Sequence, residues 1–124
     1  MNSNPISNTD VKLDAEIIGL GPKFLVRVKL QNTGNSPVYG SYLTVTFNPV
    51  YYSMGYNRNS LPTLPVPVLV PDHTHIVETE IRSVDALGRS DNILIIVSSP
   101  QKDHTATPLI SASVRMPVSE VEYL

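Results

Sequence analysis

The fold is decided by one stretch of sequence, Gly19–Asn32, which reads GLGPKFLVRVKLQN. Apolar residues occupy every second position from Phe24 to Leu30, and the positions between them are charged apart from Leu25. Because successive side chains of a strand point to opposite faces, this pattern predicts a strand with one buried and one solvated face. Turn-forming residues precede and follow it, as Gly-Leu-Gly-Pro and Gln-Asn-Thr-Gly-Asn-Ser-Pro. The stretch therefore predicts a two-faced β-sheet.

Similar patterns recur along the chain on both sides of this stretch. Further strands are predicted where apolar and polar residues alternate, or where β-branched and aromatic residues dominate. These expected strands cover residues 10–18, 38–47, 64–71, 74–84, 93–97 and 108–116. Prolines in the 64–71 segment cannot donate to a ladder, so this segment is expected at a sheet edge. Five consecutive apolar residues at 93–97 predict a buried central strand.

The spacing of these strands indicates the fold class. Seven to eight expected strands, separated by turns and without a convincing helix, predict an all-β chain with an immunoglobulin-like antiparallel β-sandwich. A closed barrel is the alternative, but the proline-rich edge and the uneven loops favour an open sandwich. We expect a domain over residues 10–120, a flexible lead-in at 1–9 and a tail at 121–124.

The composition argues against several classes of function. The chain has 124 residues, a formal net charge of −2 and no cysteine. A charge this close to zero disfavours a nucleic-acid-binding surface, and the absence of cysteine favours an intracellular location. The apolar runs are much shorter than a membrane span, so no direct membrane insertion is expected.

Candidate catalytic and metal-binding residues are few. His73 and His75 would share one face of a strand, with Glu78 and Glu80 close behind them in sequence. This spacing specifies a metal only weakly, and the Pro-Asp-His-Thr turn is a place where polar residues are expected anyway. A metal-binding sandwich is therefore the less favoured alternative. Because the chain has no Gly-x-Ser-x-Gly elbow, cysteine nucleophile or P-loop, we expect no catalytic residue, no enzymatic activity and no cofactor.

Two groups of residues are candidates for contact with a partner protein. The irregular segment Asn48–Thr63 carries tyrosines and an arginine, which are enriched at interface hot spots. The strand Lys23–Gln31 carries a basic stripe that could contact an acidic partner. Each has a structural explanation too, since tyrosines can cap the end of a sandwich and charged stripes are usually solvated faces. The predicted interaction residues are Tyr51, Tyr52, Tyr56, Arg58, Arg27 and Lys29.

Several short strings occur in the order seen in a known family. They are Gly19-Leu20-Gly21-Pro22 with Phe24, Leu30-Gln31-Asn32-Thr33, Tyr52-Ser53, Val66-Pro67-Val68-Leu69-Val70-Pro71, Glu78-Thr79, Gly88-Arg89-Ser90-Asp91 with Ile93, Pro108-Leu109-Ile110-Ser111-Ala112, Met116-Pro117 and Ser119-Glu120. In this order, over roughly residues 11–120, they resemble the carboxy-terminal domain of the Bardet–Biedl syndrome protein one family. The chain departs from the resemblance at Gly55–Thr63, which resembles an insertion.

The resemblance implies a fold, a complex and a location. The fold is a γ-adaptin-ear-like β-sandwich, and the complex is the BBSome, a coat-like assembly that carries membrane proteins into and out of cilia. The implied partners are other BBSome subunits, and the implied locations are the cytoplasm, the cilium or flagellum and the ciliary base. In that family an amino-terminal β-propeller binds a small Arf-like GTPase, so we expect this chain to be an excised domain without that activity.

Two functions are compatible with the resemblance. The first is a non-catalytic scaffolding domain that contributes to assembly of the coat. The alternative is an ear domain that binds peptide motifs of cargo or accessory proteins. Ear domains of clathrin adaptors bind short acidic–hydrophobic peptides, a mode that would use basic strand residues such as Arg27 or Lys29. No site residue is carried over from those domains.

Overall fold

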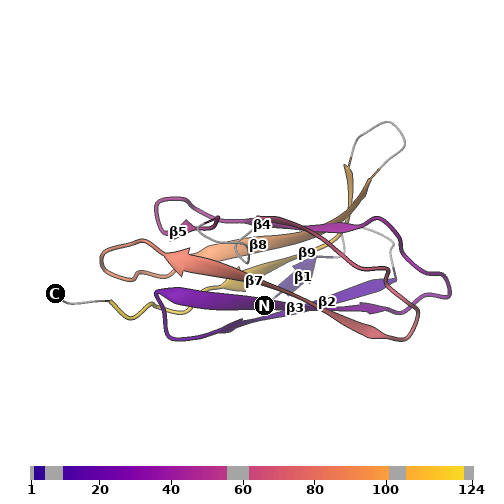
Figure 1. Ribbon diagram of the computed structural model, residues 1–124, viewed down its shortest axis with the longest axis horizontal. Helices are drawn as coiled ribbons and strands as arrows, with labels where there is room; N and C mark the ends of the chain where they lie inside the picture. Colours follow the sequence, from indigo (N-terminus) through magenta and orange to yellow (C-terminus); the bar gives the residue numbers. More distant parts are fainter. Residues whose placement is uncertain (1, 5–9, 56–61, 101–105, 122–124) are drawn as a thin grey trace.

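The chain folds into two antiparallel β-sheets that pack face to face (Figure 1). A computed structural model describes residues 2–4, 10–55, 62–100 and 106–121. Within them the strands are β1 (Asn2–Asn4), β2 (Val11–Ile18), β3 (Lys23–Asn32), β4 (Tyr42–Thr46), β5 (Tyr52–Ser53), β6 (Thr63–Pro65), β7 (Thr74–Ser83), β8 (Asn92–Pro100) and β9 (Ala106–Arg115). The predicted all-β sandwich is confirmed.

The five-stranded sheet has the order β1-β9-β8-β4-β6. Strand β8 lies in its middle, pairing with β9 on one side and β4 on the other, as the apolar run at 93–97 predicts. Ile93, Ile95 and Val97 are buried against the facing sheet, while Leu94 and Ile96 between them are half-buried. Strand β6 ends the sheet at the proline-rich segment, so the predicted edge position is confirmed.

The four-stranded sheet has the order β2-β3-β7-β5 and is built around the stretch that decides the fold. Strands β2 and β3 form an antiparallel hairpin, in register from Val11 opposite Asn32 to Ile18 opposite Leu25. Strand β3 then pairs with β7 along its other edge. Phe24, Val26, Val28 and Leu30 are buried, so the alternation in the sequence places the core correctly. Each such fully buried side chain stabilises the fold by about 1.5–3 kcal/mol.

Several segments differ from their expected lengths, and the strand predicted at 93–97 extends over Asn92–Pro100. The strand predicted at 38–47 is shorter, because β4 begins only at Tyr42 and a positive φ of 67° at Gly40 interrupts the extended chain before it. Beyond β6, residues 66–71 leave the ladder, although Leu69 forms an isolated bridge with Val38. Within the expected lead-in, β1 pairs with the edge of β9.

No helix in the described ranges is long and apolar enough to span a membrane.

Candidate functional site

The predicted tyrosine site is only partly a surface. Tyr56 and Arg58 lie outside the described residues. Tyr52 belongs to the hydrophobic core with 1% of its surface exposed, and its hydroxyl oxygen accepts a hydrogen bond of 3.0 Å from the backbone N–H of Asp91. Burial raises the pKa of this hydroxyl. Because its side chain is enclosed, Tyr52 is a core residue that closes the end of the sandwich, and its prediction as a contact residue is wrong.

Tyr51 is half-exposed and contacts Arg89, which is not among the interaction residues predicted from the sequence. The guanidinium carbon of Arg89 lies 5.5 Å from the centroid of the Tyr51 ring, within the range of a cation–π interaction. The Tyr51 ring is tilted against that of Tyr52, with 6.3 Å between their centroids. Tyr51 and Arg89 therefore form one half-exposed surface, which we call the Tyr51–Arg89 surface, on top of a buried aromatic ring.

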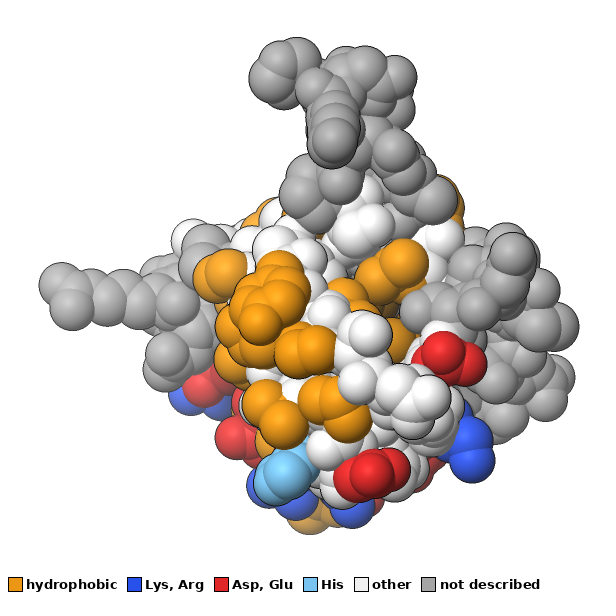
Figure 2. Space-filling view, turned by 90° about the vertical axis from the view of Figure 1, so that its right-hand side faces the viewer, with side chains coloured by type: hydrophobic (Ala, Val, Ile, Leu, Met, Phe, Trp, Pro, Cys, Tyr) orange, Lys and Arg blue, Asp and Glu red, His pale blue; other side chains and the backbone are white. Residues whose placement is uncertain are grey.

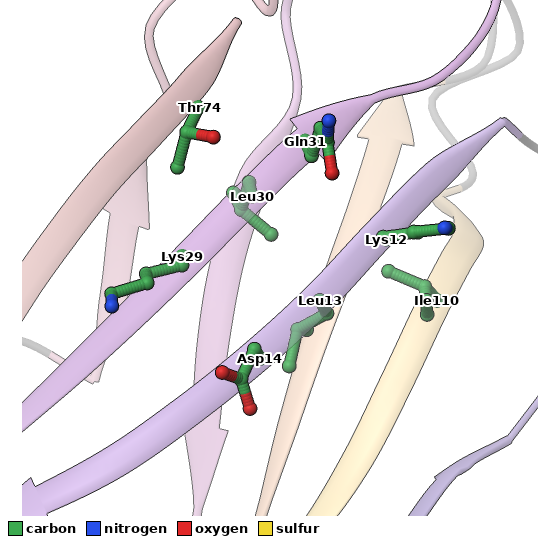
Figure 3. A pocket seen from close by; sticks show the side chains of 8 residues that line it. All are labelled: Lys12, Leu13, Asp14, Lys29, Leu30, Gln31, Thr74 and Ile110. Carbon is green, nitrogen blue, oxygen red and sulfur yellow. The ribbon is translucent and has the colours of Figure 1, made fainter. Parts of the chain in front are cut away.

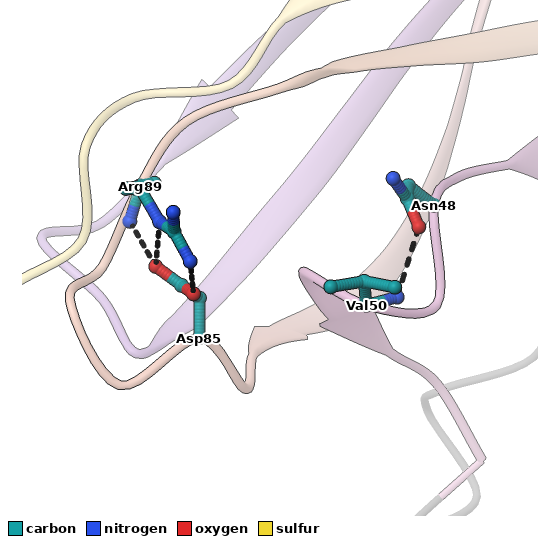
Figure 4. Close-up of polar contacts among 4 residues, drawn as sticks. All are labelled: Asn48, Val50, Asp85 and Arg89. Atoms are coloured by element: carbon teal, nitrogen blue, oxygen red, sulfur yellow. Dashed lines mark hydrogen bonds and ion pairs between the residues drawn. The ribbon is translucent and has the colours of Figure 1, made fainter.

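Asp85 holds Arg89 in place (Figure 4). Its carboxylate accepts hydrogen bonds from the backbone N–H of Arg89 at 2.8 Å, from Nε at 3.0 Å and from Nη2 at 2.8 Å. These side-chain and backbone hydrogen bonds lower the pKa of Asp85 to about 2 and raise the pKa of Arg89. Bidentate pairing of this kind fixes the plane of the guanidinium group. The loop between β7 and β8 thus presents Arg89 in one orientation.

The Asp85–Arg89 pair makes stability depend on pH in a defined window. Since the pKa of Asp85 is lower in the folded chain than in the unfolded one, the pair stabilises the fold above about pH 4, and this contribution is lost as the pH falls towards about 2. Asp85→Asn is expected to be less stable than wild type at pH 7 and equally stable near pH 2, measured by urea unfolding. Arg89→Gln should lose the same pH-dependent component. If the free energy of unfolding fell equally in wild type and Asp85→Asn between pH 7 and pH 2, the pairing would be contradicted.

The predicted basic stripe is largely neutralised within its own sheet. Cross-strand register places Arg27 between Glu16 and Glu78 on the solvent face. Arg27 Nε donates to Glu78 Oε2 at 2.7 Å, which raises the pKa of Arg27, and Nη1 lies 3.4 Å from Glu16 Oε1. Lys23 Nζ lies 3.6 Å from Glu80 Oε1. The pattern of strand β3 alone does not reveal these acids, because they come from β2 and β7.

Lys29 is the residue of the stripe that forms no ion pair with a described residue. It lines a cleft of about 470 Å³ whose walls come mainly from β2 and β3 (Figure 3). Lys12, which also forms no ion pair with a described residue, lines the same cleft, together with Asp14 and the apolar Leu13, Leu30 and Ile110. Because Leu13 and Leu30 are buried, the cleft combines two cationic side chains and one carboxylate with the half-buried Ile110.

The histidines and glutamates of the metal-binding alternative are not brought together. His75 Nε2 accepts a hydrogen bond of 3.0 Å from the backbone N–H of Val70, and His73 Nδ1 lies 2.9 Å from the carbonyl oxygen of Pro71. Glu78 and Glu80 face Arg27 and Lys23 instead. Among the described residues no group of three His, Cys, Asp or Glu side chains is placed to hold a metal ion. The third histidine of the chain, His104, lies outside the described residues.

Comparisons with known proteins agree with this fold. Residues 11–122 match the family described as the GAE domain of the Bardet–Biedl syndrome 1 protein. The chain is 35% identical over 121 residues to the BBSome complex member BBS1 of Mus musculus, and 36% identical over 121 residues to that of Homo sapiens. Each alignment covers 94% of this chain but 19% of the relative, so the chain spans about a fifth of the length of these proteins. The chain belongs to the family of Bardet–Biedl syndrome 1 GAE domains.

Proposed function

We propose that the chain is a non-catalytic protein-interaction domain of a BBSome subunit, and that it contributes to assembly of the coat that carries membrane proteins to and from cilia. The observation that carries this proposal is the family match over residues 11–122, since the matched relatives are named as members of the BBSome complex. Other BBSome subunits are then its partners. Its places of action are the cilium or flagellum, the ciliary base and the cytoplasm.

The Tyr51–Arg89 surface is the first candidate for the contact. Tyrosine and arginine contribute strongly to interfaces because they bury large areas and keep a polar group for hydrogen bonding. The Asp85 carboxylate fixes Arg89, so little side-chain entropy remains to be lost on binding. Tyr56 and Arg58, which follow Tyr51 in the sequence, stay proposed interaction residues.

The proposal is tested by a pull-down of purified BBSome subunits with the immobilised chain. The test variant is Tyr51→Ala/Arg89→Ala, which leaves the buried Tyr52 in place. Tyr42→Ala/Arg82→Ala is the matched control, because it removes the same two residue types from a half-exposed and an exposed position, as the test variant does. We expect the wild type and the control to retain a subunit that the test variant loses, with the thermal midpoints of all three showing that they are folded.

The other outcomes locate or overturn the interaction. Equal binding by the wild type and both variants would move the contact away from the Tyr51–Arg89 surface, to Arg27 and Lys29 on the four-stranded sheet. If the folded wild-type chain retains no subunit, the proposed interaction function is wrong for this domain.

The cleft beside Lys29 supports peptide binding as a second candidate function. Two cationic side chains near the half-buried Ile110 are complementary to a short acidic–hydrophobic segment of a cargo or accessory protein. Such a peptide should bind more weakly as salt rises, because Lys12 and Lys29 are exposed. Titration of an acidic–hydrophobic peptide into wild type and Lys29→Gln tests this, and affinity that is unchanged in Lys29→Gln would exclude the cleft.

A further inference from the structure

One end of the sandwich carries an exposed apolar patch that none of the functions above uses. The side chains of Tyr39, Val68 and Val70 are 66%, 42% and 41% exposed. The antiparallel bridge between Val38 and Leu69 explains why they lie together. Leu69 is buried, so its neighbours Val68 and Val70 point to the opposite, solvent-facing side. In the antiparallel register of the bridge, Tyr39 lies opposite Val68. Figure 2 shows hydrophobic side chains gathered in the middle of this end of the molecule.

The patch has a rigid base. Val38 and Leu69 exchange two backbone hydrogen bonds of 3.1 and 3.0 Å. The buried side chain of Asn32 adds a third, because its Nδ2 donates to the carbonyl oxygen of Leu69 at 2.9 Å. The backbone N–H of Val70 donates to His75 Nε2 at 3.0 Å. The backbone that carries the exposed side chains is thus held in position before any partner binds, which lowers the entropic cost of binding.

Two acidic residues lie beside this base. The backbone N–H of Asp72 donates to the carbonyl oxygen of Asn32 at 2.9 Å, and the carbonyl oxygen of Asp10 accepts from the next residue, Thr33. Asn32 and Thr33 are neighbours, so one turn brings both acids to the end that carries the patch. Both residues are exposed, and neither carboxylate forms an ion pair with a described residue. Figure 2 shows acidic side chains at the margin of the apolar group.

We propose that this end of the sandwich is a docking surface for a partner segment that carries an apolar anchor flanked by lysine or arginine. The apolar anchor packs against Tyr39, Val68 and Val70. The flanking cations are attracted by the carboxylates of Asp10 and Asp72. Complementary charge at the rim favours such a partner and speeds its association. The surface differs in sign from the Lys12–Lys29 cleft, so the two sites select opposite kinds of segment.

The same charges argue against a second copy of this chain as the occupant. A twofold-symmetric dimer through this patch would place identical surfaces against each other. It would therefore bring together four carboxylates, from Asp10 and Asp72 of each copy, without a basic residue of the patch to offset them. A heterologous basic–apolar segment avoids this repulsion.

The test is a selection of short random peptides, displayed on phage, against the immobilised wild-type chain, followed by fluorescence anisotropy of the enriched peptides. Tyr39→Ser/Val68→Ser removes the apolar contact, and Asp10→Asn/Asp72→Asn removes the charge. Asparagine at position 72 tolerates the positive φ of 63° found there. Leu87→Ser is the matched control, since Leu87 is an exposed apolar residue, 69% accessible, in the β7–β8 loop.

Enriched peptides are expected to carry lysine or arginine next to an aromatic or aliphatic residue. Their affinity should fall about tenfold or more in Tyr39→Ser/Val68→Ser, fall about two- to fivefold at low salt in Asp10→Asn/Asp72→Asn, and stay unchanged in Leu87→Ser. Thermal midpoints near that of wild type establish that the variants are folded.

Three results would overturn the proposal: no enrichment, enrichment of acidic peptides, or basic–apolar peptides that bind Tyr39→Ser/Val68→Ser as tightly as wild type. A peptide-free, concentration-dependent self-association lost in Tyr39→Ser/Val68→Ser would identify a second copy as the occupant and would also overturn it. Because the selection contains no BBSome subunit, its failure is distinct from a failure of the proposed assembly function.

Discussion

Replacing Tyr52 with alanine is expected to destabilise the domain by about 3–5 kcal/mol, the cost typical of removing a large aromatic side chain from a core. Tyr52 is 1% exposed and packs within the hydrophobic core. Its ring also supports the Tyr51 ring, and its hydroxyl oxygen accepts the hydrogen bond from the backbone of Asp91. Urea unfolding of the wild type and the variant at pH 7 measures the difference.

Tyr52→Phe is the matched control for this prediction. It keeps the ring and removes only the hydrogen bond to the backbone N–H of Asp91, so a loss of about 0.5–1.5 kcal/mol is expected. A loss below about 1 kcal/mol for Tyr52→Ala would contradict burial of the ring. It would also restore the interpretation of this tyrosine as an exposed contact residue, whose removal weakens binding and leaves stability nearly unchanged.

Replacing Asn32 with alanine is expected to cost about 2–4 kcal/mol, because each buried polar group left without a partner costs about 1–3 kcal/mol. The side chain is buried, with Nδ2 donating to the carbonyl oxygens of Ser36 at 2.8 Å and Leu69 at 2.9 Å. Its Oδ1 accepts from the backbone N–H of Gly34 at 2.9 Å. Asn32 thereby ties the end of β3 to the segment that carries Val68 and Val70.

Asn32→Asp distinguishes the contribution of the two hydrogen bonds donated by Nδ2 from that of the bond accepted by Oδ1. Aspartate keeps the size of the side chain and the acceptor for Gly34, but it faces the two carbonyl oxygens with no donor. We expect Asn32→Asp to lose at least as much stability as Asn32→Ala at pH 7, and peptides selected on the apolar patch to bind it more weakly. An Asn32→Asp domain as stable as wild type in urea unfolding would show that these two donor bonds do not stabilise the fold.

Much of the sandwich was predictable from local pattern alone. Strand β3 alternates apolar and charged residues, so its buried face and its hairpin with β2 follow from the period of a strand. The central position of β8 follows from its unbroken apolar run, and the edge position of β6 from proline. These features depend on residues that are close in sequence.

The candidate site was less predictable because it depends on contacts between distant segments. The irregular segment around Tyr52 has no period, so sequence alone does not separate its buried tyrosine from its exposed one. Whether Arg27 is free depends on Glu16 and Glu78, which only the register of three strands places beside it. The Asp85–Arg89 pair has a local signal, an acid and an arginine four residues apart around Gly88, which could have been used.

The measurement that tests the central claim most directly is hydrogen–deuterium exchange of the chain, alone and mixed with purified BBSome subunits. If the domain is an interaction domain of the BBSome, backbone amides around Tyr51 and in the Asp85–Arg89 loop should exchange more slowly in the mixture. The core amides of β3 and β8 should be protected equally in both samples. Identical exchange throughout the chain, at subunit concentrations that assemble the complex, would contradict the claim.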